Sequence, residues 1–264
     1  MTTRLSFVFA LLVLSAALVH AQNGDAVDAS QELAALGRKC QAVNSVRVVW
    51  AGLEKEKDKS WEEARLFGTS TTWFDKRRGL YRGEGVKSTT VTNILVTKVG
   101  TIAWTVLSKT RQPNPKGIVL IAREEYQLKN KSGTLPLALG PSAFAADALD
   151  GYPAVLKTFE VTKGAAQPPS VDNAVWFTLT PRPGTPFADR SGHDPMRFQL
   201  ALDMETGLPA AFASLSGKGQ GALFRVLLIE TDPCTEGVFR IPPQVRKLGV
   251  RDERTGEPVE LPED

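Results

Sequence analysis

His193 is the residue in this sequence best suited to acid–base chemistry. It lies in the segment SGHDP, residues 191–195. A hydrolase with a Ser-His-Asp arrangement would have to use it, because histidine is the commonest general base near neutral pH. No G-x-S-x-G nucleophile motif occurs, since the nearest stretch around Ser142 ends in Phe144 where a glycine is required. We interpret His193 as a loop histidine and keep a secreted hydrolase that uses it as the least favoured alternative.

The spacing of the Cys, His and Glu residues predicts neither a metal site nor an acid–base pair of carboxylates. Zinc sites hold cysteine and histidine close together, whereas Cys40 and Cys234 lie 194 positions apart. Glu62 and Glu63 are adjacent, so their side chains diverge on a strand or a helix and form no acid–base pair. No dinucleotide-binding or phosphate-binding glycine motif is present. We therefore expect no catalytic residue, no metal and no cofactor.

The overall charge excludes a protein built mainly to bind nucleic acid. Lys and Arg number 32 and Asp and Glu 29, so the formal net charge is only +3. Of the 264 residues, 42% are hydrophobic, which is enough for a packed core and excludes a disordered chain. One domain is the natural expectation for this length, and we expect a monomer.

The first 21 residues read as a secretory signal peptide. Arg4 precedes an apolar run from Leu5 to Val19, and Val19-His20-Ala21 has the small residues of a cleavage site. A membrane anchor is the alternative, but the run is shorter than the roughly 20 residues that span a bilayer. We predict cleavage after Ala21 and a periplasmic or secreted protein.

Export bears on the two cysteines, because disulfides form and persist outside the cytoplasm. An even cysteine count in an exported chain favours a bridge between Cys40 and Cys234. The alternative is two reduced, buried cysteines that never meet.

One helix precedes the strands. Residues 23–44 place Leu33, Leu36, Cys40 and Val43 on one helical face. From Ser45 the apolar period changes to two, which is typical of half-buried strands. Residues 135–152 form the second helical candidate, broken at Gly140 and Pro141.

The last third of the chain predicts four strands, at residues 175–180, 196–203, 208–215 and 223–231. Tight turns join the last three into a meander. Residues 249–264 are charged and poor in apolar side chains, so we expect a flexible tail after a single domain at 22–248. The fold class is α+β: one large curved antiparallel sheet, a half-barrel, with an N-terminal helix and a central helical lid.

Four short motifs in this order resemble the LolA/LolB-like family, which includes periplasmic lipoprotein carriers and outer-membrane lipoprotein-sorting proteins. They are residues 99–104 (VGTIAW), 176–181 (WFTLTP), 198–209 (FQLALDMETGLP) and 239–242 (FRIP). The sequence departs from the family pattern at Val99, because family members carry Asp at this position of the hairpin. Arg47 and Arg65 are the candidates for the carriers' ligand-side arginine.

The resemblance implies a cavity between the sheet and the helical lid, open to an acyl chain or to a partner's hydrophobic segment. Alternation along the strands selects which side chains point inward. The expected cavity residues are Trp50, Ile102, Trp104, Phe177, Phe198, Leu200 and Leu202.

We expect a non-enzymatic binding protein or carrier for a lipid or lipoprotein acyl group. Contact with a membrane surface and with an envelope protein is compatible with that role, and nucleic acid is not an expected partner. The alternative on the same fold is a periplasmic protein-interaction or sensor module.

Overall fold

The structure is a computed structural model that describes residues 28–87, 90–96, 100–107, 110, 113, 119–121, 133–135, 139–164, 171–190, 196–233 and 236–261. The predicted signal peptide with Ala21, the loop histidine His193 and the cysteine Cys234 lie outside these residues.

A helix over residues 28–40 comes first in the described chain. The first six strands are β1 (Ser45–Lys55), β2 (Arg65–Asp75), β3 (Leu80–Lys87), β4 (Thr90–Val96), β5 (Thr101–Leu107) and β6 (Val119–Ile121). Two helices follow, α2 (Ser142–Ala148) and α3 (Pro153–Thr158). The rest comprises β7 (Phe159–Lys163), β8 (Ala174–Pro181), α4 (Pro186–Arg190), β9 (Arg197–Asp203), β10 (Pro209–Leu215), β11 (Gly221–Thr231), α5 (Pro243–Leu248), β12 (Val250–Asp252) and β13 (Pro258–Val259).

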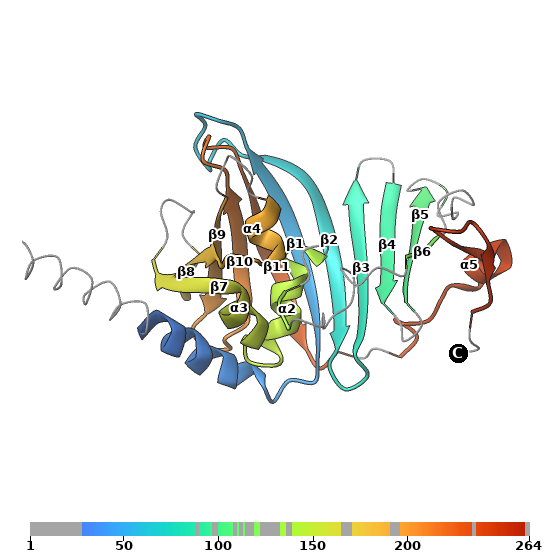
Figure 1. The fold of residues 1–264 in the computed structure, drawn as a ribbon, viewed down its shortest axis with the longest axis horizontal. Coiled ribbons are helices and arrows are strands. Elements are labelled where there is room, and N and C mark those ends of the chain that lie inside the picture. Colours follow the sequence, from blue (N-terminus) through green and yellow to red (C-terminus); the bar gives the residue numbers. More distant parts are fainter. Residues whose placement is uncertain are drawn as a thin grey trace, which may run out of the picture.

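All thirteen of these strands belong to one sheet, in the order β13-β12-β6-β5-β4-β3-β2-β1-β11-β10-β9-β8-β7. Every strand pair is antiparallel except β12 with β6. The sheet curves without closing, since β13 and β7 remain at its two ends (Figure 1). The predicted fold class, a large curved antiparallel sheet with few helices, is confirmed.

Helices cover the concave face at one end of this sheet. The helix over residues 28–40, with α2 and α3, lies against the part formed by β7 to β11 and β1 (Figure 1). Leu33, Leu36 and Cys40 are buried there, as their helical spacing predicts. The sheet supplies the opposing apolar side chains, among them Val46, Val48 and Trp50 of β1, together with residues of β8 to β10.

A second, smaller core lies on the other face. Leu95 and Val96 are neighbours on β4, so they point to opposite faces of the sheet. Val96 belongs to the concave core, whereas Leu95 packs with Ile102 and Trp104 of β5. Three side chains of the C-terminal segment cover that group: Ile241, Val245 and Val250.

The expectation of a flexible tail from residue 249 is wrong for most of that segment. Val250–Asp252 forms β12 and pairs with β6, and Pro258–Val259 forms β13 at the edge of the sheet. Val250 is buried, and Val259 and Leu261 pack against the same core. A few apolar side chains are enough to pack this segment against the second core. Its high charge content alone does not predict this packing.

The predicted disulfide between Cys40 and Cys234 is not present in this structure, because Cys40 is a free, buried thiol. Its Sγ donates a hydrogen bond of 3.2 Å to the carbonyl of Thr206, in the turn between β9 and β10. Burial raises the pKa of Cys40 to about 11, against a smaller opposing effect of Lys39. The even number of cysteines allows a pairing, but in this structure the side chain of Cys40 is buried in the concave core as a free thiol.

Candidate functional site

All seven residues expected to line a cavity are buried, but they do not share one site. Five belong to the concave core: Trp50, Phe177, Phe198, Leu200 and Leu202. Ile102 and Trp104 belong to the core on the opposite face. Alternation along β5 shows that these two side chains share a face, yet it cannot say which face of the sheet that is. Placing them in the same cavity as the other five is therefore wrong.

Several phenylalanine rings in and beside the concave core form a continuous series of contacts. Successive ring centroids are 5.7 Å apart for Phe67–Phe224, 6.4 Å for Phe224–Phe212, 6.0 Å for Phe212–Phe198, 5.3 Å for Phe198–Phe187 and 5.1 Å for Phe187–Phe159. Phe144 of α2 closes the chain, at 4.5 Å from Phe212 and 6.3 Å from Phe159. We call these seven side chains the phenylalanine chain. Of these seven, only Phe198 is among the residues expected to line the cavity; the others lie on strands β2, β7, β10 and β11 and on the short helices α2 and α4.

The outer end of the phenylalanine chain reaches an open hollow. Phe67 is 41% exposed and lines this hollow, whose volume is about 450 Å³. The complete lining is Glu54, Lys55, Glu56, Phe67, Met196, Ser214, Ser216, Gln220, Gly221 and Ala222. Met196 also packs against the concave core. The hollow therefore joins a charged rim to an apolar interior.

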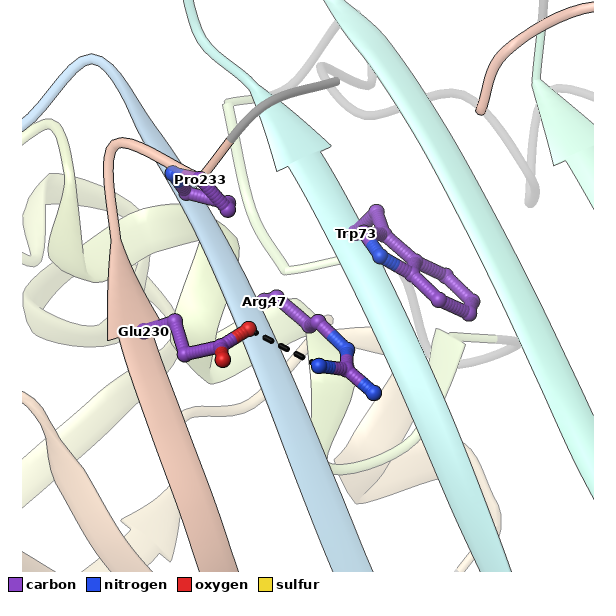
Figure 2. Close-up of a pocket in the computed structure, with 4 residues that line it drawn as sticks. All are labelled: Arg47, Trp73, Glu230 and Pro233. Carbon is purple, nitrogen blue, oxygen red and sulfur yellow. Dashed lines mark hydrogen bonds and ion pairs between the residues drawn. The ribbon is translucent and has the colours of Figure 1, made fainter. Parts of the chain in front are cut away.

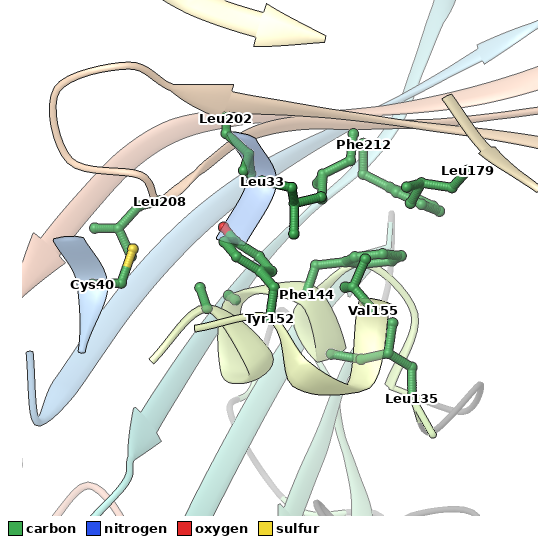
Figure 3. Close-up of a cluster of buried hydrophobic side chains, with 14 of the residues drawn as sticks. Leu33, Cys40, Leu135, Phe144, Tyr152, Val155, Leu179, Leu202, Leu208 and Phe212 are labelled. Atoms are coloured by element: carbon green, nitrogen blue, oxygen red, sulfur yellow. The ribbon is translucent and has the colours of Figure 1, made fainter. Parts of the chain in front are cut away.

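Helices α2 and α3 close the inner end (Figure 3). Phe144, Tyr152 and Val155 point from these helices toward Phe212 and Leu202 of the sheet. Several hydrogen bonds hold the helices to the rest of the molecule, and two of them are short. The hydroxyl of Tyr152 donates to the carbonyl of Gly207 at 2.8 Å, and Nζ of Lys76 donates to the carbonyl of Leu149 at 2.6 Å.

Asp147 is a buried carboxyl group within this pair of helices. Its two oxygens accept the backbone N–H groups of Ala154 and Val155, at 3.0 and 2.7 Å, at the start of α3. Burial raises the pKa of Asp147 to about 7, although these two hydrogen bonds lower it. Asp147 therefore connects α2 to α3 with a group that titrates near neutral pH.

The opposite face of the sheet carries a second hollow, of about 480 Å³, lined by Arg47, Trp73, Glu230 and Pro233 (Figure 2). Arg47 and Glu230 form an ion pair of 2.9 Å. The guanidinium of Arg47 also lies over the ring of Trp73, at 5.8 Å from its centroid.

Neither candidate for a ligand-side arginine lies in the concave core. Arg47 points into the second hollow on the other face. Arg65 is largely exposed at the start of β2 and pairs with Glu54 at 3.6 Å. Neither Arg47 nor Arg65 is therefore placed to act on a ligand in the concave core, as the resemblance suggests for the carriers' arginine.

The described part of the chain offers neither a candidate metal cluster nor a helix that could span a membrane. No group of three or more His, Cys, Asp or Glu side chains there could hold a metal ion. None of the described helices is long and apolar enough to cross a membrane.

Three solved structures illustrate what this chain is similar to. The MucA/MucB complex of Pseudomonas aeruginosa matches at 17% identity and a TM-score of 0.42, over 82% of this chain and 62% of that chain. An uncharacterized conserved protein from Thermus thermophilus matches at 14% identity and a TM-score of 0.45, over 81% and 94%. A LolA superfamily protein from Nitrosomonas europaea matches at 10% identity and a TM-score of 0.33, over 78% and 96%.

The chain spans a little over three fifths of the length of the MucB-containing chains that it matches. No family model matches the chain, and no curated protein matches it. Similarity at 10–17% identity concerns the fold alone.

Proposed function

We propose that this protein is an exported, non-enzymatic binding protein or carrier for the acyl chain of a lipid or lipoprotein. The phenylalanine chain, which runs from an open hollow to the underside of α2, is the observation that carries this proposal. An acyl chain is a long, flexible, wholly apolar group. Rings in contact along a line offer it apolar surface over its length, and each methylene group buried contributes about 0.8 kcal/mol.

Binding requires α2 to move away from the sheet, because Phe144 fills the space beside Phe212 in this structure. Gly140 and Gly151 flank α2, and both have positive φ, at 54° and 89°. Such positions are suited to act as pivots, since glycine adopts these angles without strain. The acyl chain would replace ring contacts as they open, so the opening costs mainly the few polar contacts that hold α2 and α3.

The charged rim of the outer hollow suits the polar end of such a ligand. Glu54, Lys55 and Glu56 lie where the phenylalanine chain meets solvent. A headgroup can therefore remain hydrated while its acyl chain enters beneath the lid. Export after cleavage at Ala21 belongs to this proposal, because lipids and lipoproteins of the envelope are met outside the cytoplasm.

Native mass spectrometry of protein purified from its own cell envelope tests the proposal directly. We expect a population heavier than the bare chain by the mass of one lipid or acylated peptide. A bare mass together with a co-purifying protein would instead support the protein-interaction module and overturn the carrier.

A matched pair of variants tests the route. Phe67→Ala shortens the phenylalanine chain at its open end, whereas Leu66→Ala removes an exposed neighbour that lines neither hollow. With a pyrene-labelled fatty acid as probe, Phe67→Ala should weaken binding about tenfold, which is about 1.4 kcal/mol. Leu66→Ala should bind as the unmodified protein does. Equal affinity of all three proteins would contradict entry at this hollow.

A further inference from the structure

Strand β11 lies in the middle of the sheet, yet half of one of its edges is unpaired. On one side, β1 pairs with β11 from Gly221 to Thr231. On the other side, β10 pairs only from Gly221 to Arg225. Among the described residues, no strand therefore pairs with residues 226–231 on the side away from β1. We call this six-residue stretch the open edge.

The open edge arises because the start of β10, after the β9–β10 turn, turns away from β11. Continued by two residues, the β10–β11 register would place Pro209 opposite Leu227, and proline has no N–H to donate to a ladder. On the N-terminal side of Pro209, the β9–β10 turn contacts the helices instead of β11. The carbonyl of Gly207 accepts from Tyr152, and a Cβ on Gly207 would collide with the carbonyl of Leu36.

Exposed leucines mark the open edge. Leu227 is 59% exposed and Leu228 is 43% exposed, although Val48 and Trp50 on the adjoining strand are fully buried. The register shifts between Val49 and Trp50, so that Leu227 is an extra residue on β11. This bulge interrupts the alternation and leaves two consecutive leucines at the surface.

Charge distinguishes one position of the open edge. Trp73, Arg47 and Glu230 stand in one row across β2, β1 and β11. The carboxylate of Glu230 ends this row on the side where the next strand would lie, and its side chain is 42% exposed. A strand added there would place a side chain beside Glu230, and a cation is favoured at that position.

We propose that the open edge binds an extended peptide segment of a protein partner by β-strand addition. Only another backbone offers alternating N–H and C=O groups at the spacing of a strand edge, so the occupant is a polypeptide rather than a lipid. The partner segment carries apolar side chains opposite Leu228 and a Lys or Arg opposite Glu230. This surface lies outside the acyl-chain site and does not depend on the proposed function.

Hydrogen exchange on the full chain tests this proposal with a synthetic peptide of alternating Val and Thr around one central Lys. We expect the peptide to slow exchange of the amides of residues 226–231. The same peptide methylated on its backbone nitrogens should give no protection, because its side chains remain while its ladder donors are lost. Protection by the methylated peptide, or protection confined to other segments, would overturn the proposal.

Side-chain variants test the register. Glu230→Gln should weaken the Lys peptide about threefold and leave a peptide with Gln in place of Lys unchanged. Leu228→Ser should also weaken binding, whereas Leu66→Ser, an exposed leucine on β2, should not. Equal loss for both peptides with Glu230→Gln would refute the charge pairing. A dimer of this chain that protects the same amides without peptide would assign the edge to a second copy instead.

Discussion

At the scale of single residues, two buried groups carry chemistry that their exposed counterparts lack. Cys40 and Asp147 are both removed from solvent, and burial disfavours the charged form of each. For Cys40 this makes the thiolate scarce at neutral pH. For Asp147 it brings a carboxyl group that organises α3 into the physiological range.

Thiol accessibility gives the first prediction. Because Cys40 is a free and fully buried thiol with a raised pKa, it should not react with a thiol reagent in the folded protein at pH 7. In urea without reductant, both Cys40 and Cys234 should react. If no thiol reacts in the unfolded, unreduced protein, Cys40 and Cys234 form a disulfide.

The second prediction concerns the pH dependence of stability through Asp147. Its folded-state pKa of about 7 lies above its ordinary value of 3.8, so between these values the folded chain holds a proton that the unfolded chain has lost. The free energy of unfolding should therefore fall as pH rises from 4 to 7, with a limiting slope of about 1.4 kcal/mol per pH unit. Asp147→Asn should remove this part of the pH dependence.

Urea unfolding at a series of pH values measures this effect. Asp172→Asn is the control, since Asp172 is an exposed aspartate outside the α2–α3 pair. This control should keep the slope of the unmodified protein. A slope that survives in Asp147→Asn would mean that another group is responsible.

At the scale of elements, the turn between β9 and β10 joins three parts of the molecule. Gly207 sits in it with φ at 74°, directly against the carbonyl of Leu36. Its own carbonyl accepts from Tyr152, and the neighbouring carbonyl of Thr206 accepts from Cys40. The N-terminal helix, the segment before α3 and the sheet therefore meet at this turn.

The third prediction compares two turn glycines. Gly219, between β10 and β11, has φ at 84° but open space around it. Gly219→Ala should cost only the strain of positive φ, about 1–2 kcal/mol. Gly207→Ala should cost a further 1–3 kcal/mol, roughly, because the added methyl group displaces the helix over residues 28–40. Equal unfolding free energies for the two variants would show that the helix yields without cost.

At the scale of the whole molecule, one sheet supports a core on each face. Helices cover the concave face near β7 to β11, and the C-terminal segment covers the other face near β4 and β5. A third cluster, formed by Ala201, Ala211, Ala213 and Leu223, packs behind β9 to β11 on the face away from the helices. Strands β1 and β11 lie between the first two cores in the strand order, and they carry the open edge and part of the second hollow.

The fourth prediction tests the contribution of the C-terminal segment. Val245 is fully buried in the second core, whereas Lys247 is exposed on the same helix α5. Val245→Asp should lower the unfolding free energy by about 3 kcal/mol or more, because it buries an unpaired charge. Lys247→Asp should change it by less than about 1 kcal/mol. If neither variant changes the unfolding free energy in urea by more than about 1 kcal/mol, the C-terminal segment does not contribute to the stability of the sheet.

Residue spacing along the chain is enough to predict the local elements and their apolar faces. Helical spacing placed Leu33, Leu36 and Cys40 on one buried face, and alternation placed Val46, Val48 and Trp50 together. The three-strand meander from residue 196 to 231 also follows from its turns. These properties depend on neighbours a few residues apart, so a linear pattern is enough to predict them.

Only the tertiary structure decided which face each set joins and what fills it. Ile102 and Trp104 share a face by alternation, but the C-terminal segment that covers them is more than 130 positions away in the chain. The phenylalanine chain combines five strands and two short helices that have no common period. The open edge exists because a proline and a helix-bound turn end β10 early beside β11. Contacts between distant segments set all three features, and periodicity within a segment contains no information about them.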